Sequence, residues 1–175
     1  MSEGSIKVER KGHLTIITID RADRLNALDE ATGAALGAAF EAFENDREQW
    51  VAILTGSGRA FCTGNDLVAM TKGGGRGNMN RPGSHGFGFA SITKRFPLYK
   101  PVIAAINGFA VAGGLELALV CDILVAAESA KFGLTEVRWG LMPMGGGTQR
   151  LPRSIPRALA NYLILTGEQI TAAQA

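Results

Sequence analysis

Two glycine-containing turns are the first features of this sequence whose composition and spacing could perform chemistry. Each turn follows an apolar stretch and precedes an expected helix, in VAILTGSGRAFCTGND at 51–66 and VIAAINGFAVAGGLE at 102–116. The first N–H groups of a helix have no partner inside it, and the helix dipole adds positive potential there. Two such turns could therefore donate one N–H group each to a single carbonyl oxygen, as an oxyanion hole does. The alternative for either turn is that its glycines only permit tight packing of strand against helix.

Two glutamates are the candidate acid and base. Glu116 follows Gly113 by three residues, so on a helix it shares a face with the N–H groups of the second turn. Its helical neighbours are all apolar, and a carboxylate buried among them is unfavourable unless it is paired or used. The alternative is a structural glutamate stabilised by the helix dipole. For Glu136, in KFGLTEVRWG, the residues alone favour an ordinary ion pair with Arg138 or Lys131.

Other chemistries find little support. The only histidines, His13 and His85, lie in an expected turn and an expected loop, which argues against nucleophilic catalysis. Cys62 and Cys121 are too few for a disulfide framework and lack metal-ligand spacing, so we expect a reducing compartment and no metal site. Cys62 is next to a turn, but a small core thiol is its commoner role. Neither turn has the spacing GxGxxG or GxxxxGK[ST] of nucleotide-binding loops.

Composition indicates an ordinary globular protein. The 175 residues are 46% hydrophobic and 19% charged, which fits one domain over 1–175 with its own core. The 18 basic and 16 acidic side chains leave a formal charge of +2, so no nucleic-acid or membrane partner is indicated. The polar start and the absence of an apolar run of roughly 20 residues predict a cytoplasmic protein without a membrane span.

The elements that must position these groups alternate between strand and helix. The chain is expected to open with a hairpin over 6–20, and the apolar strands are followed by helices, which predicts an α/β domain with a largely parallel sheet. Asp29 and Asp66 are expected to cap helices. Strands are expected over 51–55, 101–107 and 122–127, and helices over 29–43, up to 70 after the turn at 61, over 89–96 and 113–120, from 145 and over 156–166.

Two segments leave alternatives open. Residues 72–88, KGGGRGNMNRPGSHGFG, are interpreted as a mobile loop, either a disordered surface insertion or a lid over a site. Its Lys72, Arg76 and Arg81 could meet an anionic ligand. At the other end, Thr171 is expected to cap a helix that stops after one turn, so either this end frays or the chain is the front part of a longer protein.

Several segments together resemble the enoyl-CoA hydratase/isomerase, or crotonase, superfamily. They are RADRLNAL (21–28), AFCTGNDL (60–67), PVIAAINGFAVAGGLELALVCDILVAAESAKFG (101–133) and GLMPMGGGTQRLPR (140–153). These motifs cover nearly the whole chain in the order of the family. The resemblance implies a crotonase-like spiral α/β core of repeated strand–turn–helix units that binds an acyl-coenzyme A thioester. Coenzyme A is then part of the substrate, and no further cofactor is implied.

The resemblance also assigns site residues. It places the oxyanion donors on the backbone N–H groups of Asn65 and Gly113, and the acid and base on Glu116 and Glu136, which overrides the ion-pair interpretation of Glu136. The positions that match substrate-binding and coenzyme A-binding segments are Arg24, Leu25, Ala27, Ala60, Gly64, Asp66, Leu67, Ala112, Gly114, Thr135 and Leu141.

The reaction that this resemblance implies is hydration of an enoyl-CoA thioester to a 3-hydroxyacyl-CoA. Glu116 would act as the base on water and Glu136 as the acid at the α-carbon, because isomerases of the family generally need only one such group. The alternatives are isomerisation of the double bond, dehydration of carnitinyl-CoA, and a truncated acyl-CoA-binding or oligomerisation module without turnover. The resemblance further implies a homo-oligomer, a trimer or a dimer of trimers, in which C-terminal helices absent from this chain normally pack on the core.

Overall fold

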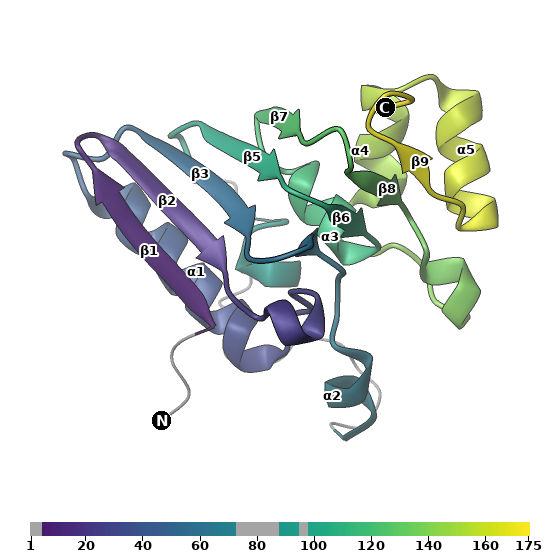
Figure 1. The fold of residues 1–175 in the computed structure, drawn as a ribbon, viewed down its shortest axis with the longest axis horizontal. Helices are drawn as coiled ribbons and strands as arrows, with labels where there is room; N and C mark the ends of the chain where they lie inside the picture. Colours follow the sequence, from purple (N-terminus) through teal and green to yellow (C-terminus); the bar gives the residue numbers. More distant parts are fainter. Residues whose placement is uncertain (1–4, 73–87, 95–97) are drawn as a thin grey trace.

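The computed structural model describes residues 5–72, 88–94 and 98–175. A five-stranded sheet with the order β1-β2-β3-β5-β7 forms one layer (Figure 1). β1 (Ile6–Lys11) and β2 (Leu14–Ile19) form the expected antiparallel hairpin. β3 (Val51–Gly56), β5 (Val102–Ile106) and β7 (Ile123–Ala126) continue from β2 in parallel. The largely parallel sheet expected from the sequence is therefore confirmed.

The long helix α1 (Glu30–Asn45) covers one face of this sheet (Figure 1). Asp29 caps it, because its Oδ1 accepts the N–H of Thr32 at 2.8 Å. Apolar residues at helical spacing, including Leu36, Phe40 and Phe43, are buried. On β2 and β3, alternate residues point to this core. The helix and the sheet thus share one apolar interior, as the sequence pattern predicted.

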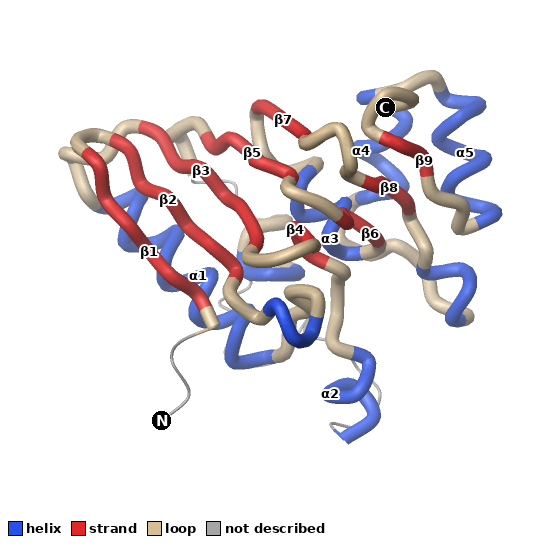
Figure 2. The backbone as a smooth tube through the Cα atoms, viewed as in Figure 1, coloured by secondary structure: helices blue, strands red, loops and turns tan. Residues whose placement is uncertain are grey.

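A second sheet of short strands, in the order β4-β6-β8-β9, was not expected from the sequence (Figure 2). Its strands are β4 (Ala60–Cys62), β6 (Phe109–Val111), β8 (Lys131–Gly133) and β9 (Ile170–Thr171). β4, β6 and β8 are parallel, and β9 is antiparallel to β8. Runs of two or three residues are too short to show an alternating pattern, so their pairing depends on partners far away in the chain.

The remaining helices are short. They are η1 (Ala22–Arg24), α2 (Leu67–Lys72), η2 (Phe89–Ser91), α3 (Gly113–Ala118), η3 (Glu136–Trp139), α4 (Gly147–Ser154) and α5 (Arg157–Thr166). α3, α4 and α5 lie where helices were expected. Asp66 caps α2, since its Oδ1 accepts the N–H groups of Val68 and Ala69, both at 3.1 Å.

One expected helix differs from the structure, and the short turn expected at the end of the chain agrees with it. The helix predicted over 89–96 is only the 3₁₀ turn η2 among the described residues, because Ala90 and Ser91 have positive φ values of 55° and 56°. The single turn expected after Thr171 is confirmed: Thr171 ends β9, its hydroxyl accepts the N–H of Gln174 at 3.2 Å, and Gln174 Oε1 accepts the N–H of Thr171 at 2.9 Å. The N–H of Ala175 donates to Thr171 O at 3.0 Å, which closes one helical turn. The loop predicted over 72–88 lies almost wholly outside the described residues.

β7 is apolar yet exposed along its whole length. Ile123, Leu124 and Val125 keep 52%, 43% and 57% of their surface in solvent. It is the outer strand of the five-stranded sheet, and neither of its faces is covered within the described ranges. In residues 5–72, 88–94 and 98–175, no helix has the length and apolar character needed to cross a bilayer.

Candidate active site

A cavity of about 420 Å³ brings together the two turns and the two glutamates. Glu116, on α3, and Glu136, at the start of η3, both line it and are only 3% and 8% exposed. Two carboxyl groups in one buried cavity are a recurrent arrangement for moving protons to and from a substrate. The other lining residues are Arg24, Ala27, Thr63, Asn65, Asp66, Leu67, Val68, Met70, Phe89, Val111, Ala112, Gly113, Thr135, Trp139, Leu141, Met142 and Met144.

The two glycine turns pack directly against each other. A Cβ atom on Gly64 would lie 2.8 Å from the backbone nitrogen of Gly113, and one on Gly113 would lie 2.8 Å from the ring of Phe89. Gly64 also has a φ of +88°, which side chains disfavour. Glycine is therefore required at both positions for this approach, so the packing role proposed for the glycines is real, and it is also what brings the two turns to one cavity.

The N–H groups of Asn65 and Gly113 are available at this contact. Leu28 forms an isolated parallel bridge with Asn65, in which Leu28 N–H donates to Gly64 O and Asp66 N–H donates to Leu28 O. That bridge does not use the N–H of Asn65. Gly113 is the first residue of α3, so its own N–H has no partner within the helix. Both residues line the cavity, which can place two donors on one carbonyl oxygen.

Two asparagines hold the first turn in place. The Nδ2 group of Asn26 donates to the carbonyl oxygens of Ser57 and Ala60 at 2.9 and 2.7 Å. The Nδ2 group of Asn107 donates to Gly58 O at 2.9 Å and to Ala60 O at 3.2 Å. Ala60 O thus accepts from both sides of the turn. These bonds fix the path of the chain from β3 into β4, which ends at the cavity.

Arg21 connects the start of α1 to the start of α2. Its Nη2 lies 2.9 Å from Asp29 Oδ2 and 3.2 Å from Asp66 Oδ2, and its Nη1 donates to the carbonyl of Ala27. Burial alone would raise the pKa of Asp66, but the N–H of Ala69 and the Arg21 guanidinium outweigh it and lower that pKa. Asp66 is therefore a carboxylate that anchors α2, whose residues Leu67, Val68 and Met70 line the cavity.

The carboxyl group of Glu116 is held by the glycine loop before α4. Its Oε1 accepts the N–H of Gly147 at 2.8 Å. Burial raises the pKa of Glu116, while backbone N–H groups of this loop and the charge of Arg150 oppose the rise. The loop therefore favours the ionised form of Glu116 within a site that otherwise disfavours it, as a base requires.

Glu136 has a different environment. Its Oε2 atom is buried and has no hydrogen-bond partner among the described residues. Burial, with the nearby charge of Glu116 as a smaller contribution, raises the pKa of Glu136 to about 7. The ion pair with Arg138 favoured by the residues alone is not formed, because Arg138 Nη2 lies 2.7 Å from Glu168 Oε1 instead. Glu136 is thus suited to carry a proton near neutral pH.

The structure brings most of the predicted substrate-binding positions to the cavity. Arg24, Ala27, Asp66, Leu67, Ala112, Thr135 and Leu141 line it. Four others do not. Leu25 follows η1 in a left-handed backbone conformation, and Ala60 is fully buried in β4. Gly64 packs against Gly113, and Gly114 packs against the carbonyl of Cys62.

Sequence reasoning missed several cavity residues. They are Thr63, Val68, Met70, Phe89, Val111, Trp139, Met142 and Met144. Trp139 is 66% exposed and Met142 is 65% exposed. Both residues follow Glu136 closely in the chain. The signal that could have identified them is the presence of large apolar side chains next to a candidate acid. Nothing local in the sequence shows which of them turn toward the cavity.

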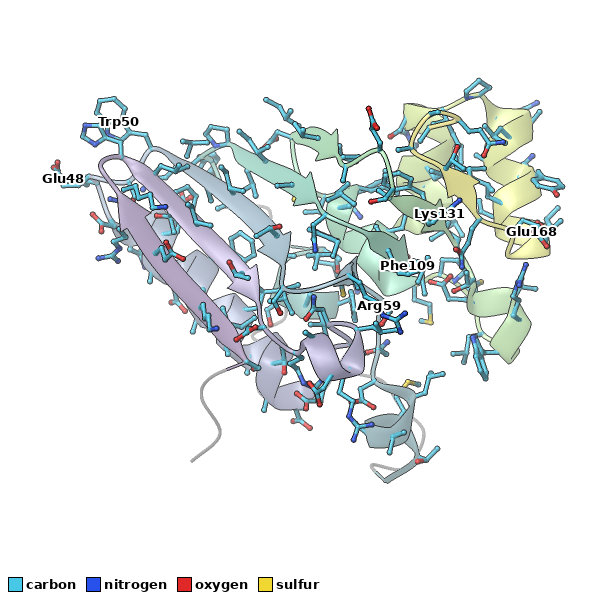
Figure 3. All side chains as sticks on the ribbon, viewed as in Figure 1. Glu48, Trp50, Arg59, Phe109, Lys131 and Glu168 are labelled. Atoms are coloured by element: carbon cyan, nitrogen blue, oxygen red, sulfur yellow. The ribbon has the colours of Figure 1, made fainter. Side chains whose placement is uncertain are left out.

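The remaining candidate groups do not converge on this cavity. His13 stacks on Trp50, with ring centroids 3.6 Å apart, and Figure 3 shows Trp50 at the end of the first sheet that is farthest from Glu168. Cys62 and Cys121 are buried, and burial raises the pKa of each thiol to about 12. Within the described part of the chain, no cluster of His, Cys, Asp and Glu has the geometry to hold a metal ion. His85 lies outside the described residues.

Comparison with known proteins shows the family to which the chain belongs. The sequence model of the family described as enoyl-CoA hydratase/isomerase matches residues 9–175. A carnitinyl-CoA dehydratase from Salmonella arizonae is 43% identical over 176 aligned residues, which include 100% of this chain and 65% of the relative. The chain therefore spans about 65% of the length of such curated relatives.

Solved structures give the same result. A carnitinyl-CoA hydratase from Mycobacterium avium superposes with a TM-score of 0.92 at 43% identity, covering 99% of this chain and 66% of that one. An enoyl-CoA hydratase from Mycobacterium tuberculosis H37Rv superposes with a TM-score of 0.90 at 42% identity, again over 99% and 66%. With the crotonase-like core and the family match both in place, the chain belongs to the enoyl-CoA hydratase/isomerase, or crotonase, family.

Proposed function

We propose that this protein adds water across the double bond of α,β-unsaturated acyl-CoA thioesters. The observation that carries the proposal is the unequal pair of buried carboxyl groups. Glu116 accepts a hydrogen bond from Gly147 at 2.8 Å, whereas Oε2 of Glu136 has no partner among the described residues. Environments that separate two carboxyl groups in this way suit one as base and the other as acid.

The proposed reaction begins with polarisation of the thioester. The carbonyl oxygen accepts the N–H groups of Asn65 and Gly113, which stabilise the enolate that forms during addition. Glu116 removes a proton from water as the water oxygen bonds the β-carbon. The electrons of the double bond move toward the carbonyl, and Glu136 then delivers its proton to the α-carbon. The product is a 3-hydroxyacyl-CoA, and dehydration follows the same path in reverse with the roles exchanged.

The direct test is loss of the enoyl-thioester absorbance when the 175-residue chain is mixed with crotonyl-CoA. Glu136→Gln should lower turnover by about 10²-fold or more with little change in acyl-CoA affinity, since it keeps the shape but cannot donate the carboxylic proton. Glu128→Gln, which changes an exposed glutamate, is the matched control. Turnover by Glu136→Gln equal to that of the control would contradict the assignment.

Dehydration of carnitinyl-CoA is a second candidate, because the similar curated relatives carry the name carnitinyl-CoA dehydratase at 43% to 44% identity. One feature of the cavity favours it: the exposed indole of Trp139 lines the wall beside Met142 and Met144. A quaternary ammonium group such as that of carnitine binds well against an indole face.

Trp139→Leu should lower kcat/KM for carnitinyl-CoA about tenfold relative to kcat/KM for 3-hydroxybutyryl-CoA, because only the first substrate has the cationic group. Trp50→Leu, at the other end of the first sheet, is the matched control. Equal losses for both substrates would argue against recognition of the ammonium group and leave plain enoyl-CoA hydration as the better function.

We further propose that the protein acts as a homo-oligomer, a trimer or a dimer of trimers. Support comes from apolar side chains that face solvent on β7 and on the η3–α5 side, including Val125, Val137 and Leu165. Exposed apolar patches of this kind are typical of surfaces between subunits.

A further inference from the structure

The three consecutive glycines at 145–147 lie between the carboxyl group of Glu116 and the guanidinium group of Arg150. Arg150, on α4, donates from Nη1 to the carbonyl of Gly145 at 2.8 Å and from Nη2 to the carbonyl of Thr93 at 2.9 Å. On the other side of the same loop, the N–H of Gly147 donates to Glu116. One short segment therefore connects a guanidinium group to the candidate base.

The glycines are required by this contact. A Cβ atom on Gly145 would lie 2.6 Å from Glu116 Oε2, and one on Gly147 would lie 3.0 Å from Glu116 Oε1. Gly146 has a φ of +105°, and its Cβ atom would lie 1.9 Å from Arg150 Nη1. Side chains at 145–147 would thus push away the carboxylate on one side or the guanidinium on the other. The loop is compressed between the two groups.

The bond to Thr93 connects a second wall of the cavity. Thr93 follows η2, and its N–H donates to the carbonyl of Phe89 at 3.2 Å. The ring of Phe89 lines the cavity and packs on Gly113, whose N–H is the second candidate oxyanion donor. Arg150 therefore contacts both the loop that holds the base and the segment that packs against the oxyanion turn.

We propose that Arg150 is a positioning residue: by bonding Gly145 and Thr93 together, it fixes the glycine loop so that Gly147 holds Glu116 ready to accept a proton from water. This inference rests on the proposed hydratase function for its catalytic meaning. Arg150 does not line the cavity, so it acts through Glu116 rather than on the substrate. A planar guanidinium is needed, because it reaches two carbonyl groups at once, which an ammonium group does less well.

The charges around Glu116 give the proposal a measurable consequence. Glu136 on η3 and Arg150 on α4 are the charged groups near it, and β4, which packs against α3, carries the buried thiol of Cys62. β6 and η2 carry no titratable side chain. Arg24 and Asp66 line the same cavity farther toward α2. Burial raises the pKa of Glu116, and the N–H groups of Gly147 and Gly145, followed by the charge of Arg150, oppose that rise. Because Arg150 also holds this loop through the Gly145 carbonyl, its removal should raise the pKa of Glu116 further.

The experiment compares Arg150→Met, Arg150→Lys and the control Arg153→Met, which changes an exposed arginine on the same helix that bonds Gln149. The readouts are kcat and KM for crotonyl-CoA from pH 5 to 9 and the unfolding midpoint. We expect Arg150→Met to move the acidic limb of the profile up by about one pH unit and to lower kcat at pH 7 by about tenfold, with a smaller change in KM. Arg150→Lys keeps the positive charge but loses the planar guanidinium that bonds two carbonyl groups. It should therefore move the acidic limb of the pH profile less than Arg150→Met does.

A direct titration separates this inference from the proposed function. The carboxyl carbon of Glu116 is followed by NMR with ¹³C-labelled glutamate, using Glu116→Gln to assign the signal. A rise of about one unit in the pKa of Glu116 in Arg150→Met supports the positioning role even if the chain hydrates no enoyl-CoA. An unchanged pKa and an unmoved acidic limb in a folded Arg150→Met overturn it. If Arg150→Met does not fold, the same comparison with Arg150→Lys decides, and a profile identical to that of Arg153→Met overturns the proposal.

Discussion

The proton held by Glu136 sets the upper pH limit of the proposed hydration. Its pKa is raised to about 7, chiefly by burial, so the group delivers a proton below that pH and is ionised above it. We expect kcat/KM for crotonyl-CoA to fall about tenfold per pH unit above pH 7, and to fall again in acid as Glu116 becomes protonated. A stopped assay over pH 5 to 9 checks the shape. A flat profile from pH 6 to 9 would show that Glu136 is not the acid.

The same glutamate should make the protein less stable as the pH rises. Its folded-state pKa of about 7 lies above the value of 4.5 expected in the unfolded chain, so folding favours the protonated form. The stability contribution is complete below pH 4.5 and is lost as the pH rises through 7. Glu136→Gln stays neutral at every pH. The free energy of unfolding of this variant should therefore exceed that of the unchanged protein by near zero at pH 4.5 and by at most about 3 kcal/mol at pH 8.

Urea unfolding of both proteins at the two pH values measures this difference. Glu128→Gln is the control, because the exposed Glu128 should give the same small effect at each pH. An advantage of Glu136→Gln that does not change with pH would mean that burial does not raise the pKa of Glu136 in the folded protein.

The residue scale also shows what the sequence could reveal about the site. The spacing of Gly113 and Glu116 predicted their shared face, because both belong to one helical turn. That Glu136 forms no ion pair with Arg138 was not predictable from its neighbours, because Arg138 pairs with Glu168, thirty positions away in the chain. The hydrogen bonds of Arg150 were not predictable either, because its two acceptors, the carbonyl groups of Gly145 and Thr93, come from separate segments of the chain.

Asn26 is the side chain that joins the turn after β2 to the start of β4. It is fully buried, has a φ of +57°, and bonds the carbonyls of Ser57 and Ala60. Asn26→Ala should lower the free energy of unfolding by about 2–4 kcal/mol, because it leaves buried polar groups unpaired and places alanine in a left-handed conformation. Chemical denaturation measures the loss.

Asn161→Ala on the exposed side of α5 is the matched control and should change stability by no more than about 0.5 kcal/mol. A similar small effect for Asn26→Ala would mean that the β3–β4 connection is held by Asn107 alone.

Elements of six or more residues were largely predictable, and the shortest ones were not. The hairpin, α1 and β3 each span enough residues to show a period, and α1 also has a recognisable cap at Asp29. The strands of the second sheet span two or three residues and form only because distant segments pair. In η2, the positive φ values of Ala90 and Ser91 interrupt the expected helix. Alanine and serine rarely adopt positive φ values, so the sequence did not predict this conformation.

At the scale of the whole molecule, the apolar edge at β7 should control association. Ile123, Leu124 and Val125 expose both faces of an outer strand, and such edges pair readily with other chains. We expect the molecular mass in solution to rise with protein concentration, and Val125→Lys to weaken this association by about tenfold or more, because a lysine on an edge strand opposes pairing.

Sedimentation equilibrium at several concentrations measures the effect. Val8→Lys changes a comparably exposed valine on β1, the opposite edge of the same sheet, and should leave the association constant within about twofold. Equal effects of the two substitutions would place the contact elsewhere on the surface.

The overall architecture was predictable because strand and helix signals alternate along the chain, and the confirmed parallel sheet follows from that order. The exposure of β7 was not, since an apolar run indicates a buried strand whether or not a neighbouring element covers it. The periodicity of apolar residues indicates which face of a strand or helix favours burial. It does not indicate which other element covers that face.

The protonated state of Cys62 has a chemical consequence for the proposed reaction of an enoyl thioester. Such substrates are soft electrophiles, and a thiolate adds to the same β-carbon that water attacks. Cys62 lies directly beneath the first glycine turn, where the N–H of Gly64 points at its sulfur at 3.4 Å. Burial raises the pKa of this thiol to about 12, so the thiol is protonated near neutral pH. In the proposed reaction this keeps the sulfur from adding to the alkene, because the thiol is protonated, fully buried and not part of the cavity lining.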